Sequence, residues 1–291
     1  MHLPHADVEL LFQFKNVGTT VKIASWNVNS VRARLQNILE WLSYSEIDVL
    51  LIQEIKCIED QFPKLEFESL GYEVAINGQK SYNGVAILSK SPISEIVIGL
   101  PNYEEDEQSR YIEANVRGLV FSSIYLPNGN PINSEKFDYK IAWMEKLKEH
   151  SKRLLDREVG VVLGGDFNVV PNDDDVHDPL AWQNDALCQI ETRKKYRELL
   201  NLGFSDAFRT FNDTPGRYTF WDYQGGAWPK DHGVRIDHFL LSPHALDICS
   251  GCTIDTSPRG KSKASDHTPI LIEIDNNEMQ LIKVFLINTC A

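Results

Sequence analysis

The stretch that decides the fold of this chain is Val159-Gly160-Val161-Val162-Leu163-Gly164-Gly165-Asp166-Phe167-Asn168. Its first half is apolar and rich in β-branched residues, and two glycines follow. This pattern is typical of a buried strand that ends in a tight loop. The backbone at a strand end is rigid enough to hold a carboxylate and an amide in fixed positions, as a catalytic group requires. Because Gly-Asp-x-Asn also forms ordinary turns, the motif alone does not establish a catalytic site.

The length and composition of the chain are those of a soluble enzyme. Its 291 residues can form one large domain or two modest ones, and 42% hydrophobic with 24% charged residues is ordinary for a globular protein. No run of about 18 apolar residues is present, so we expect no membrane span. The first residues lack the basic start and uninterrupted apolar core of a signal peptide, which predicts a cytoplasmic location.

The cysteine content and the net charge narrow the class of protein further. The five cysteines are odd in number and scattered, so we expect reduced thiols. The Cys249-Ser250-Gly251-Cys252 spacing lacks the second pair that a zinc site needs. The net charge of −13 argues against a protein that coats nucleic acid by bulk charge. It does not exclude a nuclease, because cations gathered on one face decide contact with phosphates.

Apolar periodicity predicts strands and helices along most of the chain. The spacing of amphipathic helices occurs at 31–44, within 131–155 and near 192–202. Strand patterns occur at 21–26, 47–52, 72–76, 85–88, 93–100, 111–116, 119–126, 159–163, 218–223, 235–241, 248–254 and 269–274.

We therefore expect a single catalytic α/β domain over residues 21–275. No linker or break in composition divides this range. Many strands with mixed connections and few helices favour a four-layer α/β sandwich, in which two packed mixed β-sheets are flanked by helices. Residues 1–20 are predicted to form an N-terminal extension, and residues 276–291 a C-terminal tail.

Polar and acidic side chains recur just past the predicted ends of the apolar strands. They are Asn27, Glu54, Tyr125, Asp166 with Asn168, Asp237, and Asp266 with His267. Each alone has an ordinary explanation, as a turn residue, a solvated charge, a cap or a buried histidine. Their recurrence favours one shared site, since loops held by a rigid scaffold are where sites form.

These residue types fit the hydrolysis of a phosphodiester. The reaction requires neutralised phosphate oxygens, a positioned and deprotonated water, and a protonated leaving oxygen. Carboxylates suit Mg²⁺, which takes one or two of them and keeps several waters. A histidine beside a carboxylate can be oriented and made cationic, and asparagines can hold oxygens without adding negative charge.

The order of the motifs resembles that of the exonuclease III family, the Mg²⁺-dependent apurinic/apyrimidinic (AP) endonucleases of base-excision repair. From about residue 21 to 274 they are Ser25-Trp26-Asn27, Gln53-Glu54-x-Lys56, Tyr125-Leu126-Pro127-Asn128, Gly165-Asp166-Phe167-Asn168, Tyr218-Thr219-Phe220-Trp221-Asp222-Tyr223, Arg235-Ile236-Asp237 and Ser265-Asp266-His267-Thr268-Pro269. The resemblance implies a DNase I-like fold and hydrolysis of double-stranded DNA 5′ to an abasic site. It also implies 3′-phosphodiesterase and 3′→5′ exonuclease activity, in a monomer of the bacterial type that associates with the nucleoid.

The resemblance also implies roles for individual residues. Glu54 would be the main ligand of Mg²⁺, with Mn²⁺ as a substitute, and the wider ligand set would be Asn27, Asp166, Asn168, Asp266 and His267. Asp166 would orient or deprotonate the attacking water, and Asn168 would hold the scissile phosphate. His267, paired with Asp237, would polarise a phosphate oxygen, while Tyr125 would contact the phosphate or assist the leaving group.

Contacts to DNA are expected from aromatic and basic residues. Phe220 and Trp221 would line a pocket for the baseless sugar, and the other expected contacts are Asn128, Lys56, Arg32, Arg259, Lys261 and Lys263. The basic run 193–197 is expected to be a solvated helix face instead. Asn29 stands where some relatives carry an aspartate, so a second metal site stays open.

Two alternatives compete with the nuclease interpretation. A phosphoesterase of the same superfamily that acts on inositol phosphates or phospholipids would share the Gly-Asp-x-Asn and Ser-Asp-His motifs. It should lack the aromatic pocket and the basic run before Asp266. A catalytically inactive protein that binds abasic DNA is the second alternative, although every expected catalytic position is filled.

Overall fold

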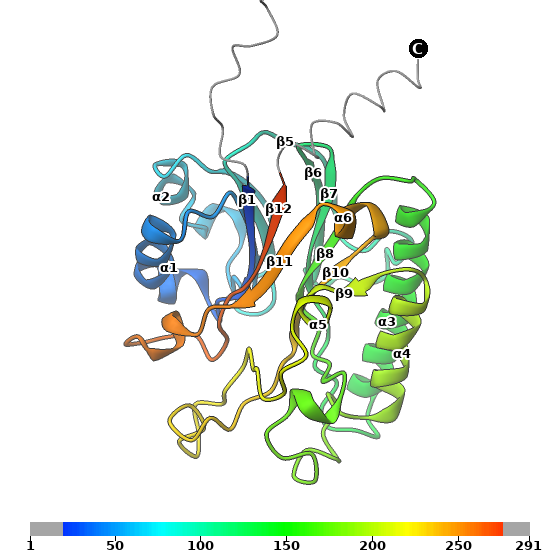
Figure 1. Cartoon of the computed structure of the whole chain (residues 1–291). Helices are drawn as coiled ribbons and strands as arrows, with labels where there is room; N and C mark the ends of the chain where they lie inside the picture. The colour runs from blue at the N-terminus through cyan, green and yellow to red at the C-terminus, as the bar shows by residue number, and fades with distance from the viewer. Residues whose placement is uncertain (1–19, 276–291) are drawn as a thin grey trace, which may run out of the picture.

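The computed structural model describes residues 20–275, which form two six-stranded sheets packed face to face (Figure 1). The first sheet has the order β11 (Cys249–Ile254), β12 (Ile270–Asp275), β1 (Thr20–Asn27), β2 (Val49–Gln53), β4 (Val85–Ser89), β3 (Glu73–Asn77). The second has the order β5 (Ile93–Ile98), β6 (Tyr111–Val116), β7 (Leu119–Tyr125), β8 (Val161–Asp166), β10 (Asp237–Leu241), β9 (Ser205–Asp206). The apolar residues between the sheets form the central core.

Helices cover the outer faces of both sheets. The helices are α1 (Val31–Ser45), α2 (Lys64–Glu68), α3 (Glu135–Leu155), α4 (Ile190–Asn201), α5 (Ala207–Phe211) and α6 (Pro243–Asp247), with short 3₁₀ turns at Glu59–Gln61, Asp173–Asp175 and Ser257–Gly260. Figure 1 shows α1 and α2 on one side and α3 and α4 on the other, and each pair buries apolar side chains against the nearer sheet. The predicted four-layer α/β sandwich is confirmed.

Two parallel pairings make the sheets mixed and set the position of the site. β1 runs parallel to β2, and β7 runs parallel to β8, while every other pairing of the named strands is antiparallel. The carboxyl ends therefore lie side by side within each pair, and a hydrogen bond from Asn27 at the end of β1 to Asp166 at the end of β8 shows that the two pairs meet at one edge of the sandwich.

The two glycines of the opening stretch lie inside β8, so the predicted tight loop at this position is wrong. A Cβ built on Gly164 would lie 2.5 Å from the Phe239 ring and 2.6 Å from Leu51 of the facing sheet. A Cβ on Gly165 would lie 2.0 Å from the carbonyl oxygen of Ile124. Glycine is required here for close packing of strands and sheets, and the strand continues to Asp166.

Other boundaries also differ from the sequence prediction. Residues 218–223 do not form a strand, since only Phe220 makes isolated bridges, to Val234 and to His267. α3 spans Glu135–Leu155, inside the predicted range 131–155. The predicted N-terminal extension and C-terminal tail lie almost wholly outside the described residues. Within residues 20–275, no helix has both the length and the apolar character that crossing a bilayer requires.

Candidate active site

Four of the expected site residues stand at the shared strand edge. Asn27 is the last residue of β1, Glu54 follows β2, Tyr125 ends β7 and Asp166 ends β8. Parallel pairing brings them together, because parallel strands end on the same side.

Asp237, Asp266 and His267 lie at the same edge, but each lies at or before the start of a strand rather than at the end of one. Asp237 begins β10 and pairs with Asp166 across an antiparallel ladder. Asp266 and His267 precede β12, which runs antiparallel to β1. The sequence prediction that all these residues follow strands is therefore wrong for three of them. The start of an antiparallel strand lies beside the end of its neighbour, so the convergence is preserved.

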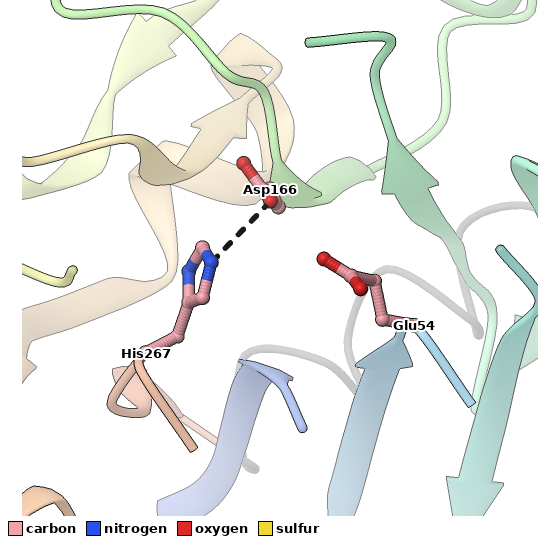
Figure 2. A group of neighbouring side chains, drawn as sticks. All are labelled: Glu54, Asp166 and His267. Atoms are coloured by element: carbon pink, nitrogen blue, oxygen red, sulfur yellow. Dashed lines mark ion pairs between the residues drawn. The ribbon is translucent and has the colours of Figure 1, made fainter. Parts of the chain in front are cut away.

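Three of these side chains point toward one another (Figure 2). One carboxylate oxygen each of Glu54 and Asp166 and one ring nitrogen of His267 lie within 4.8 Å of one another. The ring nitrogen Nε2 of His267 is 3.7 Å from Oδ2 of Asp166. Its Nδ1 is 2.8 Å from Oδ2 of Asp237, which is fully buried. The imidazole is thus held between two acids.

Asn27 links the two carboxylates of the cluster. Its Nδ2 donates to Oε1 of Glu54 at 2.8 Å and to Oδ2 of Asp166 at 2.9 Å, and its Oδ1 accepts the backbone N–H of Asn29 at 3.0 Å. In this orientation the amide is a donor that reduces the repulsion of two neighbouring acids. Its role as a metal ligand stays a prediction.

The pKa values of Asp166 and His267 are both raised, which suits proton transfer. Burial raises the pKa of Asp166 to about 7, with contributions from Asp237 and Glu54, while His267 and Asn27 oppose the rise. Burial alone would lower the pKa of His267, but Asp237 and Asp166 outweigh it and raise this pKa to about 10. His267 is therefore an imidazolium at neutral pH. The metal-ligand role of His267 stays a prediction.

Glu54 faces a cation of the chain on its other side. Its Oε2 is 2.7 Å from Nζ of Lys56, which also donates to Oδ1 of Asn29 at 2.5 Å. Burial would raise the pKa of Glu54, yet Lys56 and the amide of Asn27 together lower it. Nδ2 of Asn29 donates to Oδ1 of Asp266 at 3.0 Å, so an amide connects Lys56 to Asp266. Two or three converging carboxylates form the hard-oxygen donor set that Mg²⁺ prefers, and the site fits such an ion.

A buried lysine, Lys140, fixes the backbone of Asn128 and Asn168, the two asparagines expected to hold a phosphate. Asn168 donates from Nδ2 to the Leu126 carbonyl at 2.8 Å and accepts from Nδ2 of Asn128 at 3.1 Å. The fully buried Lys140 donates from Nζ to the carbonyls of Asn128 at 3.0 Å and Asn168 at 2.6 Å. Sequence reasoning missed Lys140. The available signal was a lysine three residues after Phe137, on the apolar face of its helix.

The cluster opens into a cavity of about 240 Å³. Its lining residues are Glu54, Tyr125, Asn128, Asp166, Asn168, Trp182, Asp185, Leu187, Phe220, Asp222, Ile236, Asp266 and His267. Four of them, Trp182, Asp185, Leu187 and Asp222, were not identified from the sequence. Three of these come from the irregular segment between β8 and α4, which carries no motif.

Trp221 does not line this cavity, so its predicted place in the sugar pocket is wrong. It is 2% exposed, its Nε1 donates to Asp231 at 2.9 Å, and its ring packs against Trp228 and Tyr218. Phe220 lines the cavity, whereas the Trp221 side chain is buried on the side of Tyr218, Trp228 and Asp231.

The expected DNA-contacting cations fall into three groups. Arg32, Lys261 and Lys263 are exposed, whereas Lys56 lies within the catalytic cluster. Arg259 is buried and lies against aromatic rings. Their contact with DNA stays a prediction.

An arginine outside the predicted site supports Tyr125. The guanidinium of Arg110 lies over the Tyr125 ring, 4.9 Å from its centroid, and donates to the Tyr125 carbonyl at 3.2 Å. Burial, with the nearby Glu54 and Asp166, raises the pKa of Tyr125 well above its ordinary value. The phenol therefore keeps its proton and can act as a donor.

Comparisons with known proteins agree with this geometry. Residues 24–267 match the family model described as "Endonuclease/Exonuclease/phosphatase family". The chain is similar to exodeoxyribonuclease III of Haemophilus influenzae, with 32% identity over 265 residues that cover 87% of this chain and 99% of that protein.

Two solved structures share the fold. An AP endonuclease from Archaeoglobus fulgidus is 36% identical with a TM-score of 0.84, and the match covers 88% of this chain and 99% of the other. A 3′ phosphatase from Neisseria, solved with a product DNA hairpin, is also 36% identical with a TM-score of 0.86 and the same coverage.

Proposed function

The chain belongs to the exonuclease III/AP endonuclease family within the endonuclease/exonuclease/phosphatase superfamily, and from this premise we propose that it cleaves duplex DNA 5′ to abasic sites. It is a nuclease that hydrolyses phosphodiesters. The products of the proposed incision are a 3′-hydroxyl and a 5′ baseless sugar phosphate. DNA repair by base excision is the process that such an activity serves.

The observation that carries the proposal is the convergence of Glu54, Asp166 and His267 beside a cavity with one apolar wall. That wall is formed by Phe220, Ile236, Leu187 and Trp182. Carboxylates and an imidazolium supply the groups for phosphodiester hydrolysis. An apolar wall suits the carbon skeleton of a sugar that carries no base.

Asp166 is the proposed acceptor of the proton from the attacking water. Its pKa of about 7 keeps it ionised in mildly alkaline solution and basic enough to take a proton. Asn27 and the backbone N–H of Asn168 each donate to one of its carboxylate oxygens, so its orientation is fixed.

The imidazolium of His267 is the proposed partner of a non-bridging phosphate oxygen. Nε2–H is the ring donor left for the phosphate, since Nδ1 is bonded to Asp237 and Nε2 is 3.7 Å from Oδ2 of Asp166, beyond hydrogen-bond distance. Asn168 and Asn128 hold the phosphate from a second side, and Tyr125 faces the same cavity as a neutral phenol. These donors are fixed before the substrate binds, which is what transition-state stabilisation requires.

Glu54 and Asp266 are the residues that would hold Mg²⁺, with Asn27 adjacent. When bound, the ion would neutralise phosphate charge and stabilise the leaving oxygen. We propose Mn²⁺ as a substitute, because it accepts the same oxygen ligands.

Incubation with a duplex that contains one tetrahydrofuran abasic analogue tests the proposal. With Mg²⁺, we expect a single cut 5′ to the analogue, no cut without metal, and a rate roughly 10²–10⁴-fold lower for Asp166→Asn. The intact duplex and a soluble inositol phosphate serve as controls. Equal cleavage of the intact duplex, or turnover of the inositol phosphate alone, would refute the assignment.

We also propose 3′-end processing at the same site. The Neisseria relative described as a 3′ phosphatase supports this part. An oligonucleotide with a 3′-phosphate at a nick should lose that phosphate, and Asp166→Asn should lose this activity to the same extent as incision. A variant that loses only one of the two activities would contradict a shared site.

A further inference from the structure

Three aromatic rings lie in contact beside the catalytic cavity. The His177 ring stacks on the His232 ring, with centroids 4.6 Å apart and an angle of 7° between the planes. The His177 ring also meets the Trp182 ring edge to face, with centroids 6.2 Å apart. We call these three side chains the ring stack. Of the three, only Trp182 lines the catalytic cavity. Because aromatic pairs in such arrangements attract each other, the ring stack restricts how Trp182 can turn.

The segment that carries Trp182 gives its ring little other support. Between β8 and α4 the chain is irregular apart from one 3₁₀ turn and one isolated bridge. Two further residues of this segment line the cavity and are held by hydrogen bonds. Asp185 accepts from Nδ2 of Asn130 at 3.1 Å, and the Leu187 carbonyl accepts the backbone N–H of Val170 at 3.0 Å. Within residues 20–275, no hydrogen bond fixes the Trp182 indole, so the position of its ring depends on packing.

His177 is the anchored member of the ring stack. Its backbone N–H donates to the Gly233 carbonyl at 3.1 Å, and its Nδ1 is 3.2 Å from the same oxygen. Since a carbonyl only accepts, Nδ1 carries a proton. Gly233 is buried and confined, because a Cβ built on it would lie 2.6 Å from Nε1 of Trp221. The His177 ring is therefore held on a backbone that cannot shift easily.

Short bridges connect the backbone beside the ring stack to the catalytic histidine. Val176 forms a bridge with Val234, and Val234 forms another with Phe220. Phe220 in turn bridges His267, and the rings of these two residues are 4.9 Å apart. The cavity wall that includes Trp182 is thus placed relative to the reacting groups by continuous contacts.

We propose that His177 is a positioning residue, which holds Trp182 in the wall of the cavity and thereby limits the size of the sugar substituent that the cavity admits. This inference rests on the proposed function and adds a residue that restricts the substrate. A baseless sugar needs less room at the carbon that would bear the base than a nucleoside does. A fixed Trp182 ring excludes a bulky group there, whereas a ring that can turn away admits it.

A graded set of duplexes tests this selectivity. The tetrahydrofuran analogue carries hydrogen, methyl or phenyl at the carbon that would bear the base, and kcat/KM for incision is measured with Mg²⁺. We expect the wild type to prefer the unsubstituted analogue. In His177→Ala, the preference over the phenyl analogue should fall about tenfold, the size of effect that pocket contacts produce. For the unsubstituted analogue KM should rise and kcat should be unchanged, because the variant leaves the reacting groups in place.

Conservative variants separate the ring of His177 from its hydrogen bond. His177→Phe keeps a flat ring for the ring stack and should retain the wild-type preference. His177→Asn keeps a donor beside the Gly233 carbonyl and should behave like His177→Ala. His244→Ala is the matched control, since His244 is exposed on α6, which follows the end of β10 remote from Asp237. If His177→Asn matched the wild type and His177→Phe matched His177→Ala, ring contact would not be what positions Trp182, and the proposal would fail.

A double variant shows whether His177 acts through Trp182. Trp182→Ala alone should lower the preference at least as much as His177→Ala does. Adding His177→Ala to Trp182→Ala should then have no further effect, because the two changes remove the same contact. Losses that add together would overturn the proposal, since His177 would act by another route.

Quenching of fluorescence by acrylamide measures the exposure of Trp182 without any substrate. The contribution of Trp182 is the difference between a protein and the same protein with Trp182→Phe. Acrylamide should quench this contribution more strongly in His177→Ala than in the wild type, and His177→Phe should restore the wild-type value. Unchanged quenching in His177→Ala would overturn the proposal. If the wild type incises none of the analogues, the proposed function is refuted, and the quenching result alone decides whether His177 positions Trp182.

Discussion

Replacing Asp237 by asparagine is the sharpest perturbation of the proposed mechanism. The asparagine oxygen can still accept the Nδ1–H of His267, so the change removes charge and keeps the shape. In the native protein Asp237 is fully buried and 2.8 Å from Nδ1, and it is the strongest of the groups that raise the pKa of His267 to about 10. Without it, this pKa should fall toward the ordinary value near 6.5, and the ring should be neutral at pH 8.

The expected loss of rate depends on how much stabilisation of the His267 imidazolium remains without Asp237. Removing one pre-positioned group that stabilises developing charge costs about 2.7–4 kcal/mol in the chemical step. Because Asp166 stays 3.7 Å from Nε2, part of the stabilisation of the imidazolium persists. We therefore expect the lower end of the range, about 3 kcal/mol in the chemical step, or roughly a 10²-fold slower rate. Since a neutral ring regains its proton in acid, the deficit should shrink as the pH falls toward 6.

The sign of the stability effect follows from the same pKa. A histidine whose pKa is raised by folding stabilises the native state fully below its unfolded pKa near 6.5, and this contribution is lost as the pH rises through about 10. The wild type should therefore lose stability between about pH 6.5 and 10. Asp237→Asn should flatten this part of the curve.

Single-turnover incision between pH 6 and 10, with NMR titration of the His267 ring, measures both effects. Asp222→Asn is the matched control, because Asp222 lines the cavity, is exposed and accepts the backbone N–H of Gln224 on Oδ1. The control should keep a near-normal rate. Wild-type turnover of Asp237→Asn at pH 8, or an unchanged pKa of His267, would refute the reasoning.

Three further changes probe other parts of the structure. Lys140→Met leaves the carbonyls of Asn128 and Asn168 without their donor and should lower kcat more than it raises KM, whereas a KM effect alone in steady-state incision would contradict a positioning role. Arg235→Met removes the fully buried guanidinium that forms ion pairs with Asp175 and Asp206. It should lower the free energy of unfolding, measured in urea, by about 3–5 kcal/mol. A loss below about 1 kcal/mol would show that the two buried acids are stable without this arginine. Gly164→Ala places a methyl group 2.5 Å from the Phe239 ring and should cost about 1–3 kcal/mol by the same measurement, so an unchanged midpoint would mean that the two sheets separate easily.

The sequence by itself determined the two-sheet fold and most members of the candidate site. Apolar residues repeat along the sequence with the period of a strand or a helix, and this pattern can be read locally. It located strands β1, β2, β7 and β8. At or next to their ends lie Asn27, Glu54, Tyr125 and Asp166. The motifs were close enough to a known family to indicate the chemistry, and the family comparison agrees.

Tertiary structure alone decided how these residues are used. Local periodicity predicts a strand but not the direction in which it runs relative to its neighbours. Only the antiparallel pairing of β10 with β8 showed that Asp237 begins its strand beside Asp166. The burial of Trp221, the inward position of Trp182 and the contacts of Lys140 depend on segments that meet from far apart in the chain. A side chain in an irregular segment takes its direction from those distant neighbours, and for this reason its role could not be read from its own stretch of sequence.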